Sequence, residues 1–108
     1  MLEAVVQPVT SGNTVTIAVA GALDMATIDL VERHIRHALS CDNHTPPATL
    51  VLDLEKVTFL GSPGLHLLLA LRATSRELGT RLVLRGAKRR VIVQPLTATG
   101  LLHLFVLE

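Results

Sequence analysis

The stretch from Leu50 to Leu71, LVLDLEKVTFLGSPGLHLLLAL, joins a strand pattern directly to a helix pattern. Its first five residues, Leu50 to Leu54, form a short and nearly continuous apolar run. Such a run is typical of a strand that is covered on both faces in a parallel sheet. A helix is predicted from about Pro63 to Leu78, with Gly79 as the residue that ends it. The stretch therefore predicts one strand-and-helix unit of an α/β sheet.

The rest of the chain repeats this alternation. Two runs rich in Val, Ile and Thr flank the turn Ser11-Gly12-Asn13 and predict a hairpin, whose second strand is expected to end at Gly21. Asp24 is a natural N-cap for the first helix, whereas Pro95 weakens the last turn of the third. The predicted elements are strands 3–9 and 14–20, a helix of about 25–40, a polar loop 41–49, strand 50–54, helix 63–78, strand 81–84, a helix 88–97 that Gly100 ends, and an apolar tail 102–107 docked on the core.

This order predicts the fold class. Alternating strands and helices favour an α/β fold with a mostly parallel sheet of four to five strands, an N-terminal antiparallel hairpin and three main helices. The chain has 108 residues, which fits a single domain over residues 1–108.

The composition excludes several classes of protein. With a net charge of +1 and only two aromatic residues, the chain is not expected to bind nucleic acid by base stacking. A lone cysteine, Cys41, excludes an internal disulfide framework and a multi-cysteine metal site. No run approaches the roughly 20 apolar residues of a membrane-spanning helix, and the first residues do not resemble a signal peptide. We therefore expect a cytoplasmic protein with no membrane partner.

The small net charge hides an uneven distribution. Residues 1–55 hold seven acidic and two basic residues, whereas residues 56–108 hold eight basic and two acidic ones. This distribution is compatible with a two-faced surface or with an ordinary solvated one.

Catalytic signals are weak. His34 and His37 share a helix face, but no further ligands accompany them, so a solvated face is favoured over a metal site. Asp53 and Glu55 lie on one face of a strand, although Asp53 is expected to mark the end of that strand. The run around Ser62 is not a nucleophile elbow, and no phosphate-binding loop is present. We expect no enzyme activity, no metal and no cofactor.

The sharpest local feature is Gly61-Ser62-Pro63-Gly64. Ser62 is predicted at the N-cap position, Pro63 at the first helical position, and Gly64 where close packing is needed. These roles alone explain the motif structurally. A serine placed there is also exposed, and a phosphate on it would meet free backbone amides and the positive end of the helix. Phosphorylation would then add about two negative charges to a binding surface without unfolding the domain.

The predicted helix 63–78 has two apolar sides. At 100° per residue, Leu67, Leu68, Leu71 and Leu78 are expected to face the sheet. Leu65 and Leu69 fall to one side, beside Arg72 and Arg76. They are interpreted either as an exposed docking patch with charged borders or as ordinary surface leucines.

Several segments together resemble a known family over nearly the whole chain. The chain resembles a STAS domain of the bacterial anti-sigma-factor antagonist type. The resemblance rests on Gly21-Ala22-Leu23-Asp24, the run Leu50 to Leu60, Ser62, Gly64-Leu65, Leu78-Gly79, Leu82-Val83-Leu84 and Thr99 to Phe105.

The resemblance implies a small cytoplasmic α/β domain that performs no catalysis. It implies binding to an anti-sigma factor, a serine kinase of the histidine-kinase-like ATPase fold, and so the release of a sigma factor. It also implies that this kinase phosphorylates Ser62, that a phosphatase restores the serine, and that Asp24 contacts the partner. The expected partner-binding residues are Asp24, Gly61, Ser62, Pro63, Gly64, Leu65, Leu69 and Arg72, on a monomer or weak dimer.

Two positions depart from the family pattern. Gly61 stands where the motif has an acid, and Pro63 stands where it has a second hydroxyl residue. These departures favour an alternative, a STAS scaffold that binds its partner without phosphorylation. A ligand-sensing module in a signalling complex is a further alternative, for which the sequence specifies no ligand.

Overall fold

The sheet begins with the predicted hairpin. In the computed structural model, which describes residues 4–40 and 46–108, β1 (Ala4–Ser11) and β2 (Thr14–Leu23) pair antiparallel. Gly12, with a φ of 59°, permits the two-residue turn between them. Val15, Ile17 and Val19 alternate into the core of the protein, as their spacing in the sequence predicts.

The predicted fold class is confirmed. The five strands follow the order β1-β2-β3-β4-β5, and every pair except the hairpin is parallel. The remaining elements are α1 (Ile28–Ser40), β3 (Thr49–Leu60), α2 (Ser62–Leu78), β4 (Arg81–Arg85), α3 (Arg90–Ala98), the short 3-10 helix η1 (Leu102–Leu104) and β5 (Val106–Leu107). The apolar tail docks on the core as expected, and it adds β5 as an edge strand.

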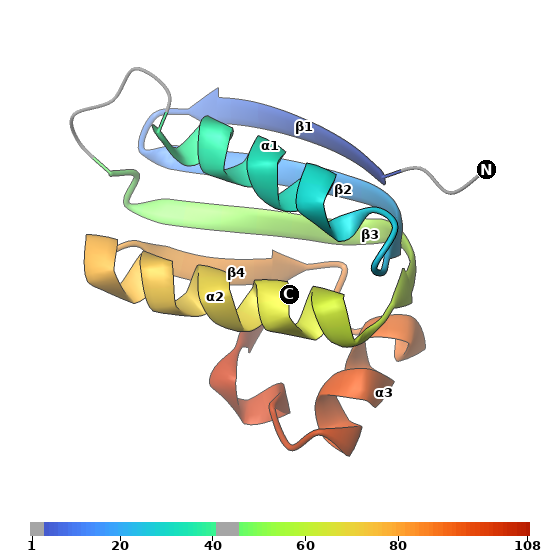
Figure 1. The fold of residues 1–108 in the computed structure, drawn as a ribbon. Coiled ribbons are helices and arrows are strands. Elements are labelled where there is room, and N and C mark those ends of the chain that lie inside the picture. The colour runs from blue at the N-terminus through green and yellow to red at the C-terminus, as the bar shows by residue number, and fades with distance from the viewer. Residues whose placement is uncertain (1–3, 41–45) are drawn as a thin grey trace.

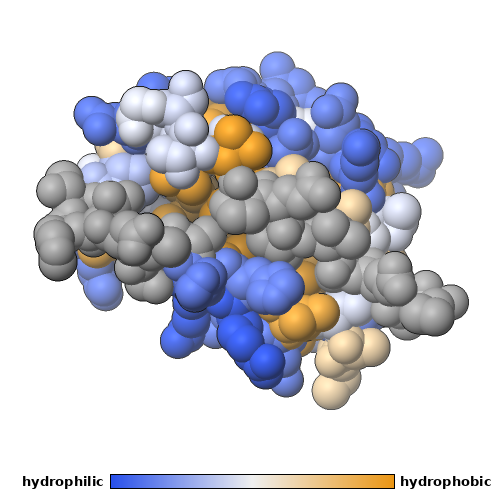
Figure 2. All heavy atoms as spheres, turned by 90° about the horizontal axis from the view of Figure 1, so that it is seen from above, coloured by the Kyte–Doolittle hydropathy of each residue, from blue (hydrophilic) through white to orange (hydrophobic). Residues whose placement is uncertain are grey.

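Helices and sheet form two layers. Figure 1 shows α1 and α2 on the same face of the sheet, with α3 beyond the carboxyl end of β3. The thinnest dimension of the molecule is 19 Å, which matches one sheet and one layer of helices at about 20 Å together. Where the grey atoms leave the surface visible from above, hydrophobic residues form small patches between hydrophilic ones (Figure 2). None of the helices in the described ranges is long and apolar enough to cross a membrane.

The central strand is buried on both faces, as Leu50–Leu54 predicts. Leu50 and Leu52 are fully buried on the helix side, and Val51 retains only 6% exposure on the other. The strand is longer than expected, because it continues to Leu60 rather than ending near Asp53.

An irregularity in this strand explains two wrong predictions. The pairing of β2 with β3 shifts register between Ala18 and Ala20, so β3 carries one extra residue there. Asp53 accepts a hydrogen bond from the amide of Glu55 at 3.0 Å and thus shapes the bulge instead of ending the strand. Gly21, with a φ of 98°, lies within β2 at a second shift in register instead of ending it.

Arg89 holds the bulge from outside the strand. Its guanidinium donates hydrogen bonds to the carbonyl oxygens of Leu54, Glu55 and Val57. Gly86 allows the next loop to approach, since a Cβ there would lie 2.8 Å from the Cα of Glu55. These contacts hold the bulge in place and thereby fix the direction of the second half of β3, which leads to Ser62.

The boundaries of the helices differ modestly from the predictions. Helix α2 ends at Leu78, and Gly79 adopts a left-handed conformation with a φ of 70°, as expected. Helix α3 continues through Pro95 to Ala98. The predicted polar loop 41–49 lies largely outside the described residues, and so do Cys41 and His44.

Candidate functional site

The turn from β3 into α2 brings Ser62 to the surface. The carbonyl of Gly61 accepts the first helical hydrogen bond, from the amide of Leu65 at 3.1 Å, so Gly61 is the N-cap. The prediction that Ser62 is the N-cap and Pro63 the first helical residue is therefore wrong by one position. No side chain caps this helix.

The shift by one residue changes what the serine hydroxyl does. Ser62 is exposed, and its side chain makes no hydrogen bond with any described residue. Pro63 has no amide proton, so the amides of Ser62 and Gly64 are the helix-start donors nearest the hydroxyl. A charged group on Ser62 would therefore meet two amides at the positive end of the helix.

Asp24 lies at the end of the neighbouring strand. The carbonyl of Leu23 accepts a hydrogen bond from the amide of Gly61 at 3.0 Å, which ties the end of β2 to the residue before Ser62. The carboxylate of Asp24 accepts the amide of Ala26 at 3.0 Å, and the buried Thr27 hydroxyl accepts the amide of Asp24 at 3.2 Å. Asp24 thus caps a turn, while the regular helix begins only at Ile28 rather than near residue 25.

Two glycines permit the close packing of this turn. A Cβ on Gly64 would lie 2.5 Å from Cδ1 of Leu60 and 2.9 Å from Cβ of Leu23. The expectation of close packing at Gly64 is confirmed. A Cβ on Gly61 would lie 3.0 Å from the ring of Phe59. The ring therefore lies over the position where the family motif carries an acidic side chain.

Two apolar side chains beside the serine are unusually exposed. Met25 is 85% exposed and Phe59 is 53% exposed. Met25 follows Asp24 directly, and Phe59 pairs with Ala22 in the sheet register. Asp24, Met25, Phe59, Ser62 and Pro63 are called the Ser62 surface below. The sequence analysis missed Met25 and Phe59, because neither stands out in a periodic pattern.

Leu65 does not belong to the exposed patch that the helix pattern suggested. It is only 8% exposed and is part of the main core cluster, whereas Leu69 is half-buried. The prediction that Leu65 is exposed is wrong: Leu65 belongs to a core cluster to which α3 also contributes Ile92 and Leu96. The buried arc of α2 is therefore wider than a single stripe.

Two further residues of α2 lie differently from the prediction. Leu78, expected to face the sheet, is 41% exposed in the last turn of α2. Arg72 lies ten residues beyond Ser62, or about 15 Å along the helix. Its Nε donates to the carbonyl of Leu104 at 3.1 Å, so the structure does not bring Arg72 to Ser62.

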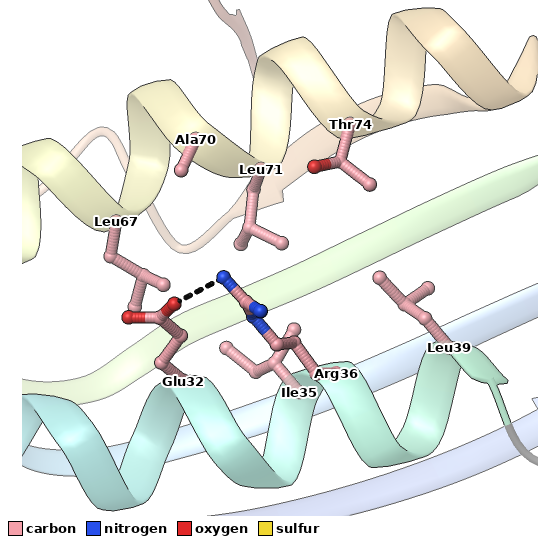
Figure 3. A pocket seen from close by; sticks show the side chains of 8 residues that line it. All are labelled: Glu32, Ile35, Arg36, Leu39, Leu67, Ala70, Leu71 and Thr74. Carbon is pink, nitrogen blue, oxygen red and sulfur yellow. Dashed lines mark hydrogen bonds and ion pairs between the residues drawn. The ribbon is translucent and has the colours of Figure 1, made fainter.

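A groove runs from Pro63 along the two helices that cover the sheet. A cavity of about 280 Å³ touches Pro63 and His66. It shares Glu32, Leu67 and Ala70 with a second cavity of the same size between α1 and α2. Figure 3 shows the apolar floor of this second cavity and the ion pair of Glu32 with Arg36, 2.7 Å long, at its side.

The described residues offer no cluster for metal chemistry. No group of three or more His, Cys, Asp or Glu side chains in residues 4–40 and 46–108 is placed to hold a metal ion. His34 and His37 are exposed on α1, in agreement with the solvated face that their spacing favoured.

The comparison with protein families agrees with this fold. The model of the STAS domain matches residues 5–108. The chain belongs to the STAS domain family. A search of curated proteins found no match to this STAS domain.

Solved structures of similar fold come from regulators and from transporters. An anti-sigma factor antagonist from Mycobacterium paratuberculosis is 29% identical, with a TM-score of 0.78, and the match covers 97% of this chain and 85% of that one. The unphosphorylated anti-sigma factor antagonist SpoIIAA is 19% identical, with a TM-score of 0.75 and coverages of 96% and 88%. A sulfate transporter family protein from Wolinella succinogenes is 18% identical, with a TM-score of 0.72 and coverages of 92% and 80%.

Proposed function

We propose that this STAS domain is an anti-sigma-factor antagonist that binds an anti-sigma factor through the Ser62 surface. In this proposal the partner is a serine kinase of the histidine-kinase-like ATPase fold, and binding takes place in the cytoplasm. The domain acts as a binding module and not as an enzyme. The observation that carries the proposal is the exposed Ser62 hydroxyl, which makes no hydrogen bond with a described residue, on two joined turns that also carry the exposed side chains of Met25 and Phe59.

The Ser62 surface has the anatomy of a small protein interface. Exposed Met and aromatic side chains are enriched in the centres of interfaces, where they lose the most water on binding. Met25 and Phe59 supply this apolar part, and the half-buried carboxylate of Asp24 supplies a polar contact. The likeness to an antagonist that is 29% identical over 97% of the chain supports an anti-sigma factor as the partner.

Phosphorylation of Ser62 is proposed as the switch. A phosphate adds about two negative charges at neutral pH. Placed beside Met25 and Phe59, it would have to lose its water when the partner covers the surface, which weakens the complex. The same phosphate would not unfold the domain, because the amides of Ser62 and Gly64 lie at the positive end of α2. A serine phosphatase would restore the binding form.

The switch is tested by incubating the protein with its cognate kinase and ATP and mapping the phosphate by mass spectrometry. We expect one phosphate, on Ser62, and none in Ser62→Ala. Ser75→Ala is the matched control, because Ser75 lies on the same helix but is only 3% exposed. Phosphate at another residue, or its absence from Ser62, would remove the switch from the proposal.

The docking surface is tested separately by the affinity for the anti-sigma factor. Met25→Lys places a charge in the proposed contact and should weaken binding at least tenfold, by analogy with interface hot spots. Leu30→Lys is the control, because Leu30 is also exposed, at 43%, but lies on α1 outside the Ser62 surface. Equal affinities for the two variants would show that the partner binds elsewhere.

One observation favours a second candidate, a STAS scaffold that binds constitutively. The ring of Phe59 occupies the space next to Gly61, where an acidic side chain would stand in the family motif. Pro63 removes an amide from the turn. Both features reduce the resemblance to a kinase substrate. In this alternative Ser62→Asp leaves the partner affinity unchanged, whereas the switch predicts a large loss.

A further inference from the structure

A third cavity lies far from the Ser62 surface, at the edge of the sheet. It has a volume of about 190 Å³ and is bounded by the second half of α2, the start of β4 and the segment around Phe105. Three arginines line it: Arg72 and Arg76, one turn apart on α2, and Arg81 on β4. The other lining residues are uncharged, so the cavity carries three positive charges and no acid.

These charges are not neutralised within the fold. None of the three arginines forms an ion pair with a described residue. Arg72 is held by the bond from its Nε to the carbonyl of Leu104, which leaves its two terminal nitrogens without a partner in the described chain. Like charges that line one cavity repel each other, and a bound anion would relieve that repulsion.

The hydroxyl groups at the cavity offer little to a ligand. Thr80 donates its hydroxyl to the carbonyl of Pro47 at 2.7 Å. Ser75 is only 3% exposed. The arginines are therefore the main groups available to a ligand. The planar guanidinium group of an arginine can donate two hydrogen bonds at once to the oxygens of a phosphate or carboxylate.

The cavity also has an apolar wall. Leu82, Phe105 and Val106 contribute to this part of its lining. A ligand that fits both sides carries a compact, multiply charged oxyanion and a small carbon body beside it. A phosphate, with about two charges and three acceptor oxygens, fits three arginines better than a single carboxylate does.

We propose that the cavity between α2, β4 and Phe105 binds a small molecule that carries a phosphate group, with Arg72, Arg76 and Arg81 on the phosphate and Phe105 beside its carbon body. This site is independent of the proposed function, because its arginines lie on the second half of α2 and on β4, away from Ser62. It also explains Arg72, whose side chain is directed to Leu104 and not to the Ser62 surface.

The proposal is tested by NMR titration of the whole protein with inorganic phosphate, phenyl phosphate, acetate and citrate, at constant ionic strength set with NaCl. Saturable shifts are expected for the Nε–H signals of the three arginines with both phosphates. Phenyl phosphate should bind about threefold or more tightly than inorganic phosphate, because its ring contacts the apolar wall. Acetate should give no saturable shift.

Variants that each remove one positive charge distinguish binding at this cavity from general attraction to a basic surface. Arg76→Gln and Arg81→Gln should each weaken phenyl phosphate binding about fivefold or more. Arg85→Gln removes the same charge from an exposed residue of β4 outside the cavity and should change it less than twofold. Circular dichroism would verify that all three variants are folded.

Three results would overturn the proposal. The first is the absence of saturable shifts with either phosphate. The second is an equal loss of affinity in Arg85→Gln and Arg76→Gln, which would indicate general attraction to a basic surface. The third is tighter binding of citrate than of phenyl phosphate, which would assign the cavity to polycarboxylates.

Discussion

The ring of Phe59 occupies the space that a side chain at position 61 would need, and this is the most unusual feature of the Ser62 surface. The Cβ that any other residue would bring to position 61 lies 3.0 Å from the ring. The backbone of Gly61, with a φ of −89°, is open to any residue. The side chain of Phe59, and not the backbone, therefore limits which residue can precede Ser62.

This limit predicts a coupling between the two positions. Asp at position 61 would cap α2, which by itself adds a few tenths of a kcal/mol relative to glycine. In the native background it must first displace the ring. Gly61→Asp should thus be more favourable in a Phe59→Ala background, by about 0.5 kcal/mol or more. A double-mutant cycle of urea unfolding measures the coupling, and additive effects would show that the ring moves at no cost.

Residues at the site differ in how well the sequence predicts them. Ser62 and Asp24 are predictable, because caps and turns use few residue types. Met25 and Phe59 are not, since an exposed apolar residue differs from a buried one only in what covers it. Leu65 was assigned to the surface because the pattern of one helix contains no information on the other elements that pack into the same core.

At the scale of elements, the bulge in β3 determines the position at which the strand ends and α2 begins. After Asp53 the continuous burial of β3 ends: Leu54, Val57 and Leu60 are buried at intervals of three residues. A search for a continuous apolar run therefore ends the strand too early. The other elements were found within a few residues, because their ends carry local signals such as Gly79.

Arg89 is predicted to stabilise this bulge. Arg89→Met removes the hydrogen bonds to three carbonyl oxygens of β3 and should lower the free energy of unfolding by about 2 kcal/mol, as for other hydrogen bonds to a charged group. Arg90→Met is the control, because Arg90 bonds only Gln94 in the part of the chain that is described. Its effect should stay within about 0.5 kcal/mol. Equal losses in urea unfolding would contradict the role of Arg89.

At the scale of the whole molecule, the strand order separates the acidic from the basic part of the sequence in space. The strands lie side by side in the order in which they occur in the chain. The acidic first half of the sequence therefore forms one side of the sheet, and the basic second half forms the other. The uneven distribution seen in the sequence is thus also uneven in space.

This separation predicts that salt stabilises the fold. Like charges are neighbours within each half, and NaCl screens their repulsion over roughly 10 Å at 0.1 M. The free energy of unfolding should rise by a few tenths of a kcal/mol between about 0.02 and 0.3 M NaCl. Urea unfolding at both concentrations measures it. The rise should be larger in Glu32→Gln, which removes the attractive pair with Arg36; a fall in both proteins would show that attraction dominates.

The strand order also bears on how the chain reaches this structure. Each strand pairs only with the strands before and after it in the sequence, so no strand has to be inserted between two that are already paired. During synthesis from the N-terminus, β1 and β2 can pair first, and each later strand can then pair with the edge strand that is already formed. The loops closed at each step stay short, which favours rapid folding. The amide of Glu108, bonded to the carbonyl of Leu84 at 2.8 Å, would complete the sheet last.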